Sequence, residues 1–330
     1  MIQLRMKNPN KNKMILFIGS SLLSGIGQVT FTLSKLIKNS KYIQFGEHIF
    51  ERYDTCFCFI IPTPDTIQYA KYYKAFCKRT IYMTVCETET VHEYYEKLFE
   101  LSDTFYTPSL FSANILKRQF PGGEFKVLHH YASPVVTKLQ TKWTPDVPTD
   151  GYIFYHIGNI IDARKNISGI ISAFMTLNLP KCYLVLKASC NRKVESPFPN
   201  VFIINEMLTI EEMEILHRRC NCYVSFSHSE GAGMGAIEAA IRNKPVIITE
   251  YGASKEYIDT PYVIPCTLTP VGVDDFLFKK DMLWGNPDIN SLMEYMRDVY
   301  DKKLNFSKSQ KTIEIMHKVP GDLHSTIFQL

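Results

Sequence analysis

One stretch, residues 225–252, constrains the fold of this chain more than any other: SFSHSEGAGMGAIEAAIRNKPVIITEYG. The apolar run at 222–226 predicts a buried strand, and residues 235–241 predict a short amphipathic helix. The turn between them contains Gly231, Gly233 and Gly235. Glycines there let an anion approach the free N–H groups at the helix start. Close packing of a helix on a strand also selects glycine, so the turn alone leaves a purely structural role open.

Two carboxylates bracket this turn. Glu230 stands at its mouth and Glu238 one turn into the predicted helix, with seven residues between them. A carboxylate is a poor phosphate ligand but a good hydrogen-bond acceptor for sugar and ribose hydroxyls. The pair therefore indicates a nucleotide-sugar, with its diphosphate on the glycines and a hydroxyl-bearing ring at each end.

The residues that follow make this pattern more specific. Lys244 and Pro245 end the helix, and VIIT at 246–249 predicts another buried strand. The stretch resembles the signature EGxGxxxxEAxxxxxPVI of the retaining GT-B glycosyltransferases of family 4. The matching positions are Glu230, Gly231, Gly233, Glu238, Ala239, Pro245, Val246 and Ile247. The resemblance implies an α/β fold of the GT-B type, in which two Rossmann-like domains with parallel sheets face each other across a cleft. It also implies donor contacts at both glutamates and along the turn, at Gly231, Ala232, Gly233, Met234 and Gly235.

Apolar strand-like runs alternate with helix-like segments along the rest of the chain, which predicts parallel sheets covered on both faces. The 330 residues are enough for two domains of ordinary size. From 267 to 285 the pattern is irregular, with Trp284 expected at the cleft, and a helix is expected at 289–302. The resemblance to GT-B proteins implies that this helix crosses back to the first domain. The expected organisation is a basic flexible tail at 1–13, an N-terminal Rossmann-like acceptor-side domain at 14–133, a linker at 134–150, a C-terminal Rossmann-like nucleotide-sugar-binding domain at 151–287, and a crossing C-terminal helix within 288–330.

The first loop favours a mononucleotide over a dinucleotide. A buried strand at 14–19 leads through a loop with Gly25 and Gly27 into a helix, as in α/β nucleotide-binding folds, but the full GxGxxG fingerprint is missing. The loop is similar to the GIGxxxxxL loop of the family 4 enzymes. That similarity implies that Gly25 and Gly27 lie beside the donor and the acceptor.

A basic pair follows the strand predicted at 152–158. Arg164 and Lys165, with Asn166 after them, offer charge and directed donors to a diphosphate just before a helix. The segment resembles the family pattern GR(x)nKN, which implies that this pair holds the donor phosphates. Asn159 stands where the family often has arginine, so the sequence leaves open which cation contacts which phosphate.

Catalysis would follow from the charge that develops on the leaving diphosphate. Arg164, Lys165 and the turn amides would stabilise that charge, and Glu230 would orient sugar hydroxyls. We expect no divalent metal in this role, because no DxD motif ends a strand, and no cofactor besides the donor substrate, a UDP-sugar or GDP-sugar. Glu87, His129 and His130 stand at the ends of first-domain strands. Glu87 either contacts the acceptor or is a solvated loop glutamate. His129 and His130 either reach a sugar or phosphate as neutral donors or are satisfied histidines at the rim.

Charge and cysteine usage exclude several classes of protein. The net charge is +4, and Arg5, Lys7, Lys11 and Lys13 account for all of it, so the body has no basic face for nucleic acid. The tail is a solvated leader or a weak membrane-surface contact. The nine cysteines lack ligand spacing, which favours reduced core thiols over zinc. With no apolar run long enough for a membrane helix and no signal peptide, we expect a cytoplasmic protein.

The residues and the family resemblance together predict a metal-independent glycosyltransferase that moves a sugar from a nucleoside-diphosphate sugar to an acceptor hydroxyl of a glycan, lipid or protein-linked glycan. That the enzyme is retaining is implied by the resemblance alone. The alternative is a noncatalytic GT-B-fold protein that binds a nucleotide-sugar or glycan. A nicotinamide-dependent oxidoreductase would need the dinucleotide fingerprint that the first loop lacks.

Overall fold

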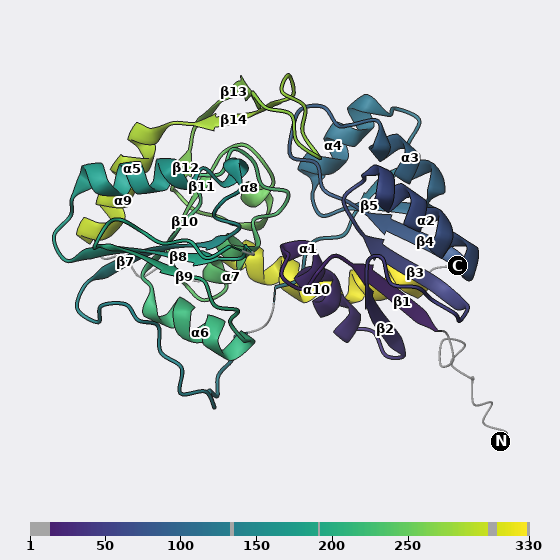
Figure 1. Ribbon diagram of the computed structural model, residues 1–330, viewed down its shortest axis with the longest axis horizontal. Helices are drawn as coiled ribbons and strands as arrows, with labels where there is room; N and C mark the ends of the chain where they lie inside the picture. Colours follow the sequence, from purple (N-terminus) through teal and green to yellow (C-terminus); the bar gives the residue numbers. More distant parts are fainter. Residues whose placement is uncertain (1–13, 133–134, 191, 303–308, 329–330) are drawn as a thin grey trace.

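The computed structural model describes residues 14–132, 135–190, 192–302 and 309–328. Two six-stranded parallel sheets lie side by side, each with helices on both faces (Figure 1). The strand orders are β2-β1-β3-β4-β5-β6 and β12-β11-β10-β7-β8-β9. The fold class expected from the sequence is confirmed. The predicted basic tail at 1–13 lies outside the described residues.

The first sheet is built from near-continuous apolar strands, as a sheet covered on both faces requires. Leu16 and Cys56 pack under α2, α3 and α4, whereas Phe17 and Phe57 pack under α1 and α10. The elements of this domain are β1 (Ile15–Gly19), α1 (Gly25–Lys35), β2 (Ser40–Gln44), β3 (Tyr53–Phe59), α2 (Pro64–Phe76), β4 (Cys77–Met83), α3 (Tyr94–Leu101), β5 (Thr104–Thr107), α4 (Leu110–Gln119) and β6 (Phe125–Val127).

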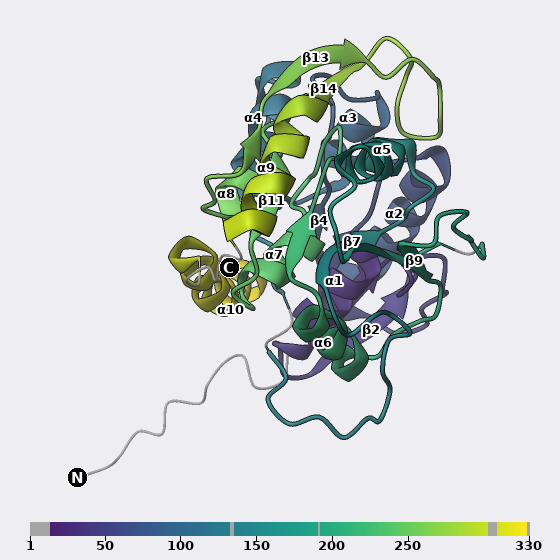
Figure 2. The same ribbon diagram turned by 90° about the vertical axis from the view of Figure 1, so that its left-hand side faces the viewer.

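The second sheet alternates its side chains between two apolar layers in the same way. Phe154 packs with α5 and α9, and Tyr155 with α6 and α7, on the opposite face (Figures 1 and 2). The elements are β7 (Tyr152–Gly158), the 3-10 turn η1 (Ala163–Lys165), α5 (Ile167–Leu177), β8 (Cys182–Ala188), β9 (Val201–Ile204), α6 (Ile210–Arg219), β10 (Cys222–Val224), α7 (Met234–Ala240), β11 (Val246–Thr249), α8 (Ser254–Tyr257), β12 (Val263–Ile264) and α9 (Ile289–Lys302).

Two segments connect the domains differently from the sequence prediction. The helix at 289–302, α9, packs on α5 in the second domain, so its predicted crossing is wrong. The crossing helix is α10 (Gln310–Phe328), whose Val319 and Leu323 pack in the first domain. An amphipathic stripe shows that a helix buries one face, but it does not say against which neighbour.

The region expected to be irregular contains an antiparallel hairpin, β13 (Cys266–Pro270) and β14 (Leu283–Pro287), which runs over the top of the molecule (Figure 1). Its loop packs Leu277 and Phe278 into the first domain's core. The backbone N–H of Glu89 donates to the carbonyl of Leu283 at 2.8 Å. The hairpin therefore ties the second domain to the first.

Candidate active site

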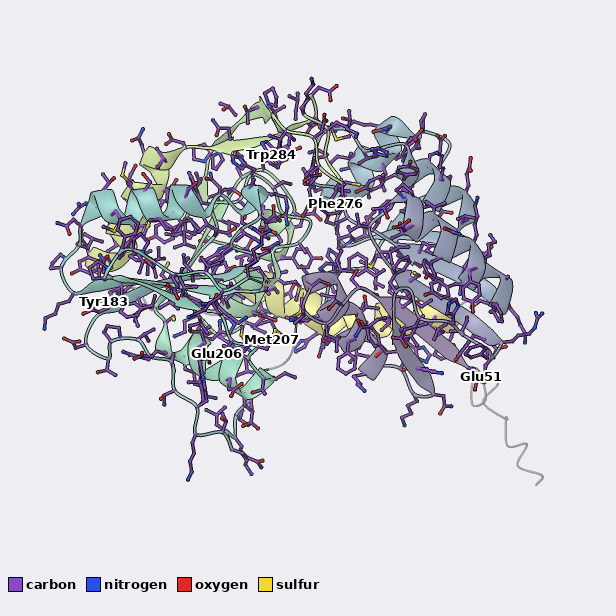
Figure 3. All side chains as sticks on the ribbon, viewed as in Figure 1. Glu51, Tyr183, Glu206, Met207, Phe276 and Trp284 are labelled. Carbon is purple, nitrogen blue, oxygen red and sulfur yellow. The ribbon has the colours of Figure 1, made fainter. Side chains whose placement is uncertain are left out.

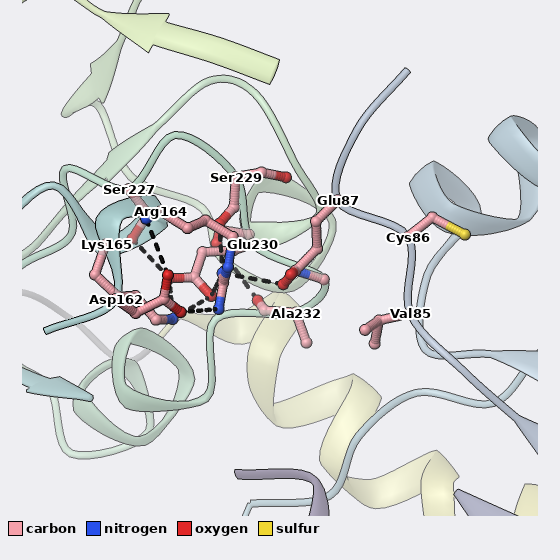
Figure 4. Close-up of polar contacts among 12 residues, drawn as sticks. Val85, Cys86, Glu87, Asp162, Arg164, Lys165, Ser227, Ser229, Glu230 and Ala232 are labelled. Carbon is pink, nitrogen blue, oxygen red and sulfur yellow. Dashed lines mark hydrogen bonds and ion pairs between the residues drawn. The ribbon is translucent and has the colours of Figure 1, made fainter. Parts of the chain in front are cut away.

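The candidate residues lie where parallel strands of the second sheet end. Strands β7 and β10 are neighbours, but the chain leaves them toward opposite edges of the sheet, which makes a topological switch point. Ligands of open α/β sheets bind at such points, beyond the carboxyl ends of the strands. The η1 turn follows β7 and the Glu230 turn follows β10, so Arg164 and Lys165 meet Glu230 here (Figure 4).

Glu230 is held by both cations. Lys165 Nζ lies 2.7 Å and 2.9 Å from its two carboxylate oxygens, and Arg164 Nη1 lies 3.5 Å from Oε2. The hydroxyl of Ser227 donates to Oε1 at 2.7 Å. Although burial opposes it, the charge of Lys165 and Arg164 holds the pKa of Glu230 at about 2. Glu230 is therefore a fixed carboxylate at neutral pH.

A carboxylate of the first domain enters the same cluster. Glu87 Oε1 lies 3.0 Å from Arg164 Nη1 and accepts the Gly231 N–H at 3.1 Å, and its residue is only 9% exposed (Figure 4). The alternative of a solvated loop glutamate is therefore excluded. Burial raises the pKa of Glu87 more than the neighbouring Arg164 lowers it. A side chain of the first domain thus occupies two donors, the Arg164 guanidinium and the Gly231 N–H, that the sequence analysis expects to bind a phosphate.

Arg164 is the centre of this network. Its guanidinium also contacts Asp162 at 3.4 Å and donates to the Ser229 carbonyl at 2.7 Å. Despite its burial, Glu87, Glu230 and Asp162 raise its pKa above the ordinary arginine value. The next residue but one, Asn166, adopts a left-handed backbone with φ 49° and joins η1 to α5. It lines an open hollow of about 760 Å³ between the start of α5 and the ends of the β13–β14 hairpin.

The glycines of the turn are each in close contact with protein. A Cβ on Gly231 would lie 2.9 Å from Val85 Cβ, and one on Gly233, where φ is +85°, would lie 2.5 Å from Ser254 Oγ. On Gly235 it would lie 2.3 Å from Tyr223 Oη. The packing explanation therefore accounts for all three glycines without a ligand. The side chains of Ala232 and Met234 are packed in apolar clusters, which leaves their backbone to any donor contact.

The other predicted donor contacts are more scattered. Glu238 Oε2 lies 3.6 Å from Nε2 of the buried His217. The Gly27 N–H donates to the Ser24 hydroxyl oxygen at 3.0 Å, and a Cβ on Gly27 would lie 2.1 Å from the Ser21 carbonyl oxygen. Gly25 has open space beside it. Ile26, between the two glycines, packs in the same apolar cluster as Met234. The first loop is thus near the α7 start across the domain boundary.

Both first-domain histidines lie away from the ion-pair cluster. The His129 ring packs edge-on against Tyr257, and burial lowers its pKa. His130 is buried with its pKa lowered to about 3, and neither ring nitrogen has a hydrogen-bond partner among the described residues. His130 is therefore not a hydrogen-bonded histidine at the rim, as one of the two alternatives expected, but a buried one without a hydrogen-bond partner among the described residues.

Three neighbours of the site were not singled out from the sequence. Asp162 accepts the Arg164 N–H at 3.0 Å, and an aspartate directly before a helical turn is a recognisable cap signal. Ser227 stands three residues before Glu230. His156 lies beneath the cluster on β7, where burial and then the charge of Lys165 lower its pKa to about 4. No local pattern marks Ser227 or His156, because their proximity depends on strand pairing.

The hairpin covers the site from above. Trp284, labelled in Figure 3, is 5% exposed and stacks on the His228 ring with centroids 4.7 Å apart. Glu256 binds the first domain instead of lying free: its carboxylate accepts the N–H groups of Leu110 and Phe111 at 2.7 and 2.6 Å. These contacts hold the two domains together beside the cluster.

Two findings, on metal sites and on membrane spans, concern only the residues that the structure describes. Within them, no group of three or more His, Cys, Asp or Glu side chains is arranged to hold a metal ion. No helix in the described part of the chain is long and apolar enough to cross a membrane. All nine cysteines are free thiols, as expected.

Comparison with known proteins defines the class. Residues 138–263 match the family model described as glycosyl transferases group 1. Sucrose-phosphate synthase from Thermosynechococcus elongatus superposes with a TM-score of 0.58 at 13% identity, over 83% of this chain and 73% of the other. A UDP-forming α,α-trehalose-phosphate synthase from Burkholderia xenovorans, in complex with glucose-6-phosphate, gives 0.56 at 9% identity, over 83% and 70%. A trehalose-6-phosphate synthase studied for glycosyltransfer with retention gives 0.57 at 10% identity, over 86% and 75%. No curated protein sequence matches the chain.

The two facing parallel sheets and these structural likenesses define a protein of the GT-B fold. Within the second domain, residues 138–263 form a glycosyl transferases group 1 domain, as the signature around Glu230 implied.

Proposed function

We propose that this enzyme transfers a sugar from a nucleoside-diphosphate sugar, with uridine or guanosine as the base, to a hydroxyl of a glycan, lipid or protein-linked glycan, with retention and without a metal. The observation that carries the proposal is the buried Arg164–Lys165 pair sharing Glu230 at the switch point of the second sheet. The UDP-forming and retaining activities in the names of the similar structures support the donor class and the stereochemistry.

The chemistry assigns a separate task to each group. The bond between the anomeric carbon and the diphosphate oxygen breaks, a bond to the acceptor oxygen forms, and the hydroxyl proton leaves with the diphosphate. Arg164 and Lys165 stabilise the charge that appears on the leaving group, aided by backbone N–H groups of residues 231–235. Two fixed cations supply what a divalent ion supplies elsewhere, which is the reason to propose metal independence.

The carboxylates orient hydroxyl groups in this scheme. Glu230 is ionised and offers hydrogen-bond acceptors to the transferred sugar. Glu238, beside His217, is assigned the ribose. Glu87 must release Arg164 and the Gly231 N–H when a phosphate takes them, because an Arg164 donor cannot serve both anions fully.

Product analysis tests the proposal directly. The protein is screened by thermal shift against UDP- and GDP-sugars, and products with added acceptors are identified by mass spectrometry and their anomeric configuration by NMR. Arg164→Ala and Glu230→Ala should each lower turnover at least tenfold, about 1.4 kcal/mol or more. Arg118→Ala, which removes a surface pair with Glu89, is the matched control and should change little.

Three outcomes would contradict parts of the proposal. Full turnover in both site variants would remove the assigned mechanism. Donor binding without transfer to any acceptor would favour a noncatalytic binding protein of this fold. An inverted product would remove the assignment of retention alone.

A further inference from the structure

Glu238, the carboxylate assigned to the ribose, faces a buried histidine. Glu238 lies on α7 and His217 on α6, and both helices cover the same face of the second sheet (Figure 1). His217 is 1% exposed, and its Nε2 atom is 3.6 Å from Glu238 Oε2. Nε2 has no hydrogen-bond partner among the described residues. A buried ring nitrogen thus faces the carboxylate from the protein side, while the Glu238 side chain stays 23% exposed.

The position of the proton on this ring follows from its two neighbours. Nδ1 lies 2.8 Å from the hydroxyl oxygen of Tyr155 on β7. Burial raises the pKa of Tyr155, and it lowers the pKa of His217 more than Glu238 raises it. At neutral pH the phenol therefore keeps its proton and the imidazole has one N–H. With that N–H at Nδ1, a lone pair of Nε2 would face the carboxylate, so the proton lies on Nε2 and the Tyr155 hydroxyl donates to Nδ1.

Packing fixes the histidine in this orientation. The Tyr155 side chain is fully buried, and its ring meets the His217 ring edge-on with centroids 5.5 Å apart. Tyr223 packs edge-on against Tyr155 as well, at 5.1 Å. A ring that is held by neighbours and by a hydrogen bond to Nδ1 keeps its Nε2–H directed at Glu238.

The surroundings of Glu238 differ from those of Glu230. Within the described parts of the chain, no lysine or arginine side chain pairs with the Glu238 carboxylate. Arg242, one turn further along, donates to the Glu214 carboxylate at 2.8 Å and to the Glu238 backbone carbonyl at 2.9 Å. The Glu238 carboxylate therefore keeps its acceptor sites for hydroxyl groups. A flexible side chain binds such groups well only when it is held in place, and the Nε2–H of His217 is the donor positioned to hold it.

We propose that His217 is a positioning residue, whose Nε2–H holds the Glu238 carboxylate in the orientation that accepts hydrogen bonds from the ribose of the donor. This inference rests on the ribose contact assigned to Glu238 in the proposed function. At 3.6 Å the contact is longer than a hydrogen bond. Charge–dipole attraction is nevertheless strong in a buried site, and a buried N–H without an acceptor is costly. His217 thus contributes to the preference for a ribose over a deoxyribose.

Calorimetric titration of the full chain with UDP, 2′-deoxy-UDP and 3′-deoxy-UDP tests the inference, with the guanosine set used if only GDP binds. Wild type should bind the ribonucleotide about tenfold tighter than the weaker of the two deoxy forms, which is about 1.4 kcal/mol. His217→Phe keeps a ring and removes both nitrogens, and this affinity ratio should fall to about threefold or less. His217→Gln places an amide N–H near the position of Nε2 and should keep most of the ratio.

Two controls separate positioning from packing. Leu216→Val loosens α6 at the neighbouring buried position without changing a polar group, and it should leave the affinity ratio as in wild type. In a Glu238→Ala background, His217→Phe should change the ratio no further, because the carboxylate that His217 holds is absent.

The outcomes separate the levels of the argument. Wild-type protein that binds neither UDP nor GDP overturns the donor class and this inference with it. Wild-type protein that binds a diphosphate but discriminates against neither deoxy form overturns the ribose contact of Glu238 and this inference, and leaves the donor class. An affinity ratio that survives in His217→Phe, or that falls as far in Leu216→Val, overturns the inference alone. If His217→Phe shows no thermal unfolding transition, Tyr155→Phe, which removes the hydroxyl that fixes the proton on Nε2, is titrated and judged by the same criteria.

Discussion

Replacement of Glu87 by glutamine should tighten donor binding, although the residue lies in the site. Glu87 is bound to Arg164 Nη1 at 3.0 Å and to the Gly231 N–H at 3.1 Å, both donors that the proposal gives to a phosphate. A phosphate that enters has to replace these contacts and approach a like charge. Glutamine keeps the shape and a neutral acceptor but removes the charge.

The magnitude follows from these two contacts. A hydrogen bond to a charged group contributes about 1.5–3 kcal/mol, against about 0.5–1.5 kcal/mol for a neutral one. The charge thus adds roughly 1–1.5 kcal/mol per contact to the cost of displacement, part of which hydration of the released carboxylate returns. We expect a net gain of about 1.4 kcal/mol, a tenfold lower Kd for UDP or GDP.

Isothermal titration of wild type and Glu87→Gln measures this difference. Glu89→Gln is the matched control, because Glu89 lies on the same loop and also reaches the second domain, through Tyr251 Oη at 2.9 Å, but contacts neither Arg164 nor Gly231. Its Kd should equal that of wild type. Donor binding that weakens or stays constant in Glu87→Gln would show that Glu87 does not compete with the phosphate.

Three further predictions concern stability and metal use. The pKa of Glu230 is about 2 in the folded state against 4.5 in the unfolded state, so its ionised form stabilises the fold by about 3 kcal/mol above pH 4.5, and this stabilisation is lost as the pH falls toward 2. The loss of unfolding free energy in Glu230→Gln, measured in urea, should therefore become smaller between pH 7 and pH 3. A loss that does not depend on pH would contradict the ion-pair account. Glu256→Ala removes the carboxylate that accepts the first two N–H groups of α4 and should cost about 1–2 kcal/mol in urea unfolding. Glu250→Ala, in an exposed pair with Lys255, should cost under about 0.5 kcal/mol, and equal costs would contradict the role given to Glu256. In excess EDTA the transfer rate should stay within about twofold of the rate without EDTA. A loss of rate that Mg²⁺ restores would refute metal independence.

Strand pairing explains why the sequence predicted that Arg164, Lys165 and Glu230 lie together but did not predict all of the residues around them. Arg164 and Glu230 follow apolar strands, and in a parallel sheet strand ends meet at one edge, so their proximity follows from local pattern and fold class. His156 sits within a strand, where side-chain position depends on register and on the neighbouring strand. Its place beneath the cluster becomes visible only when β7 and β10 are aligned.

The placement of Glu87 depended on a different kind of information. Its loop ends a first-domain strand, which the sequence indicates, but the distance to Arg164 depends on how the two domains are oriented. The β13–β14 hairpin, α10 and the Glu256 cap set that orientation through contacts between residues more than a hundred positions apart. Such contacts leave no periodic pattern in the chain.

The sequence by itself determined the two α/β domains, the ends of most helices and the group 1 signature, because apolar periodicity, caps and glycine turns are local properties. It predicted the wrong crossing helix, since α9 and α10 both bury an apolar stripe and only their docking differs. Tertiary structure alone decided that Glu87 and Glu230 share one arginine. Electrostatic energies depend on distance and solvent exposure, and folding sets both.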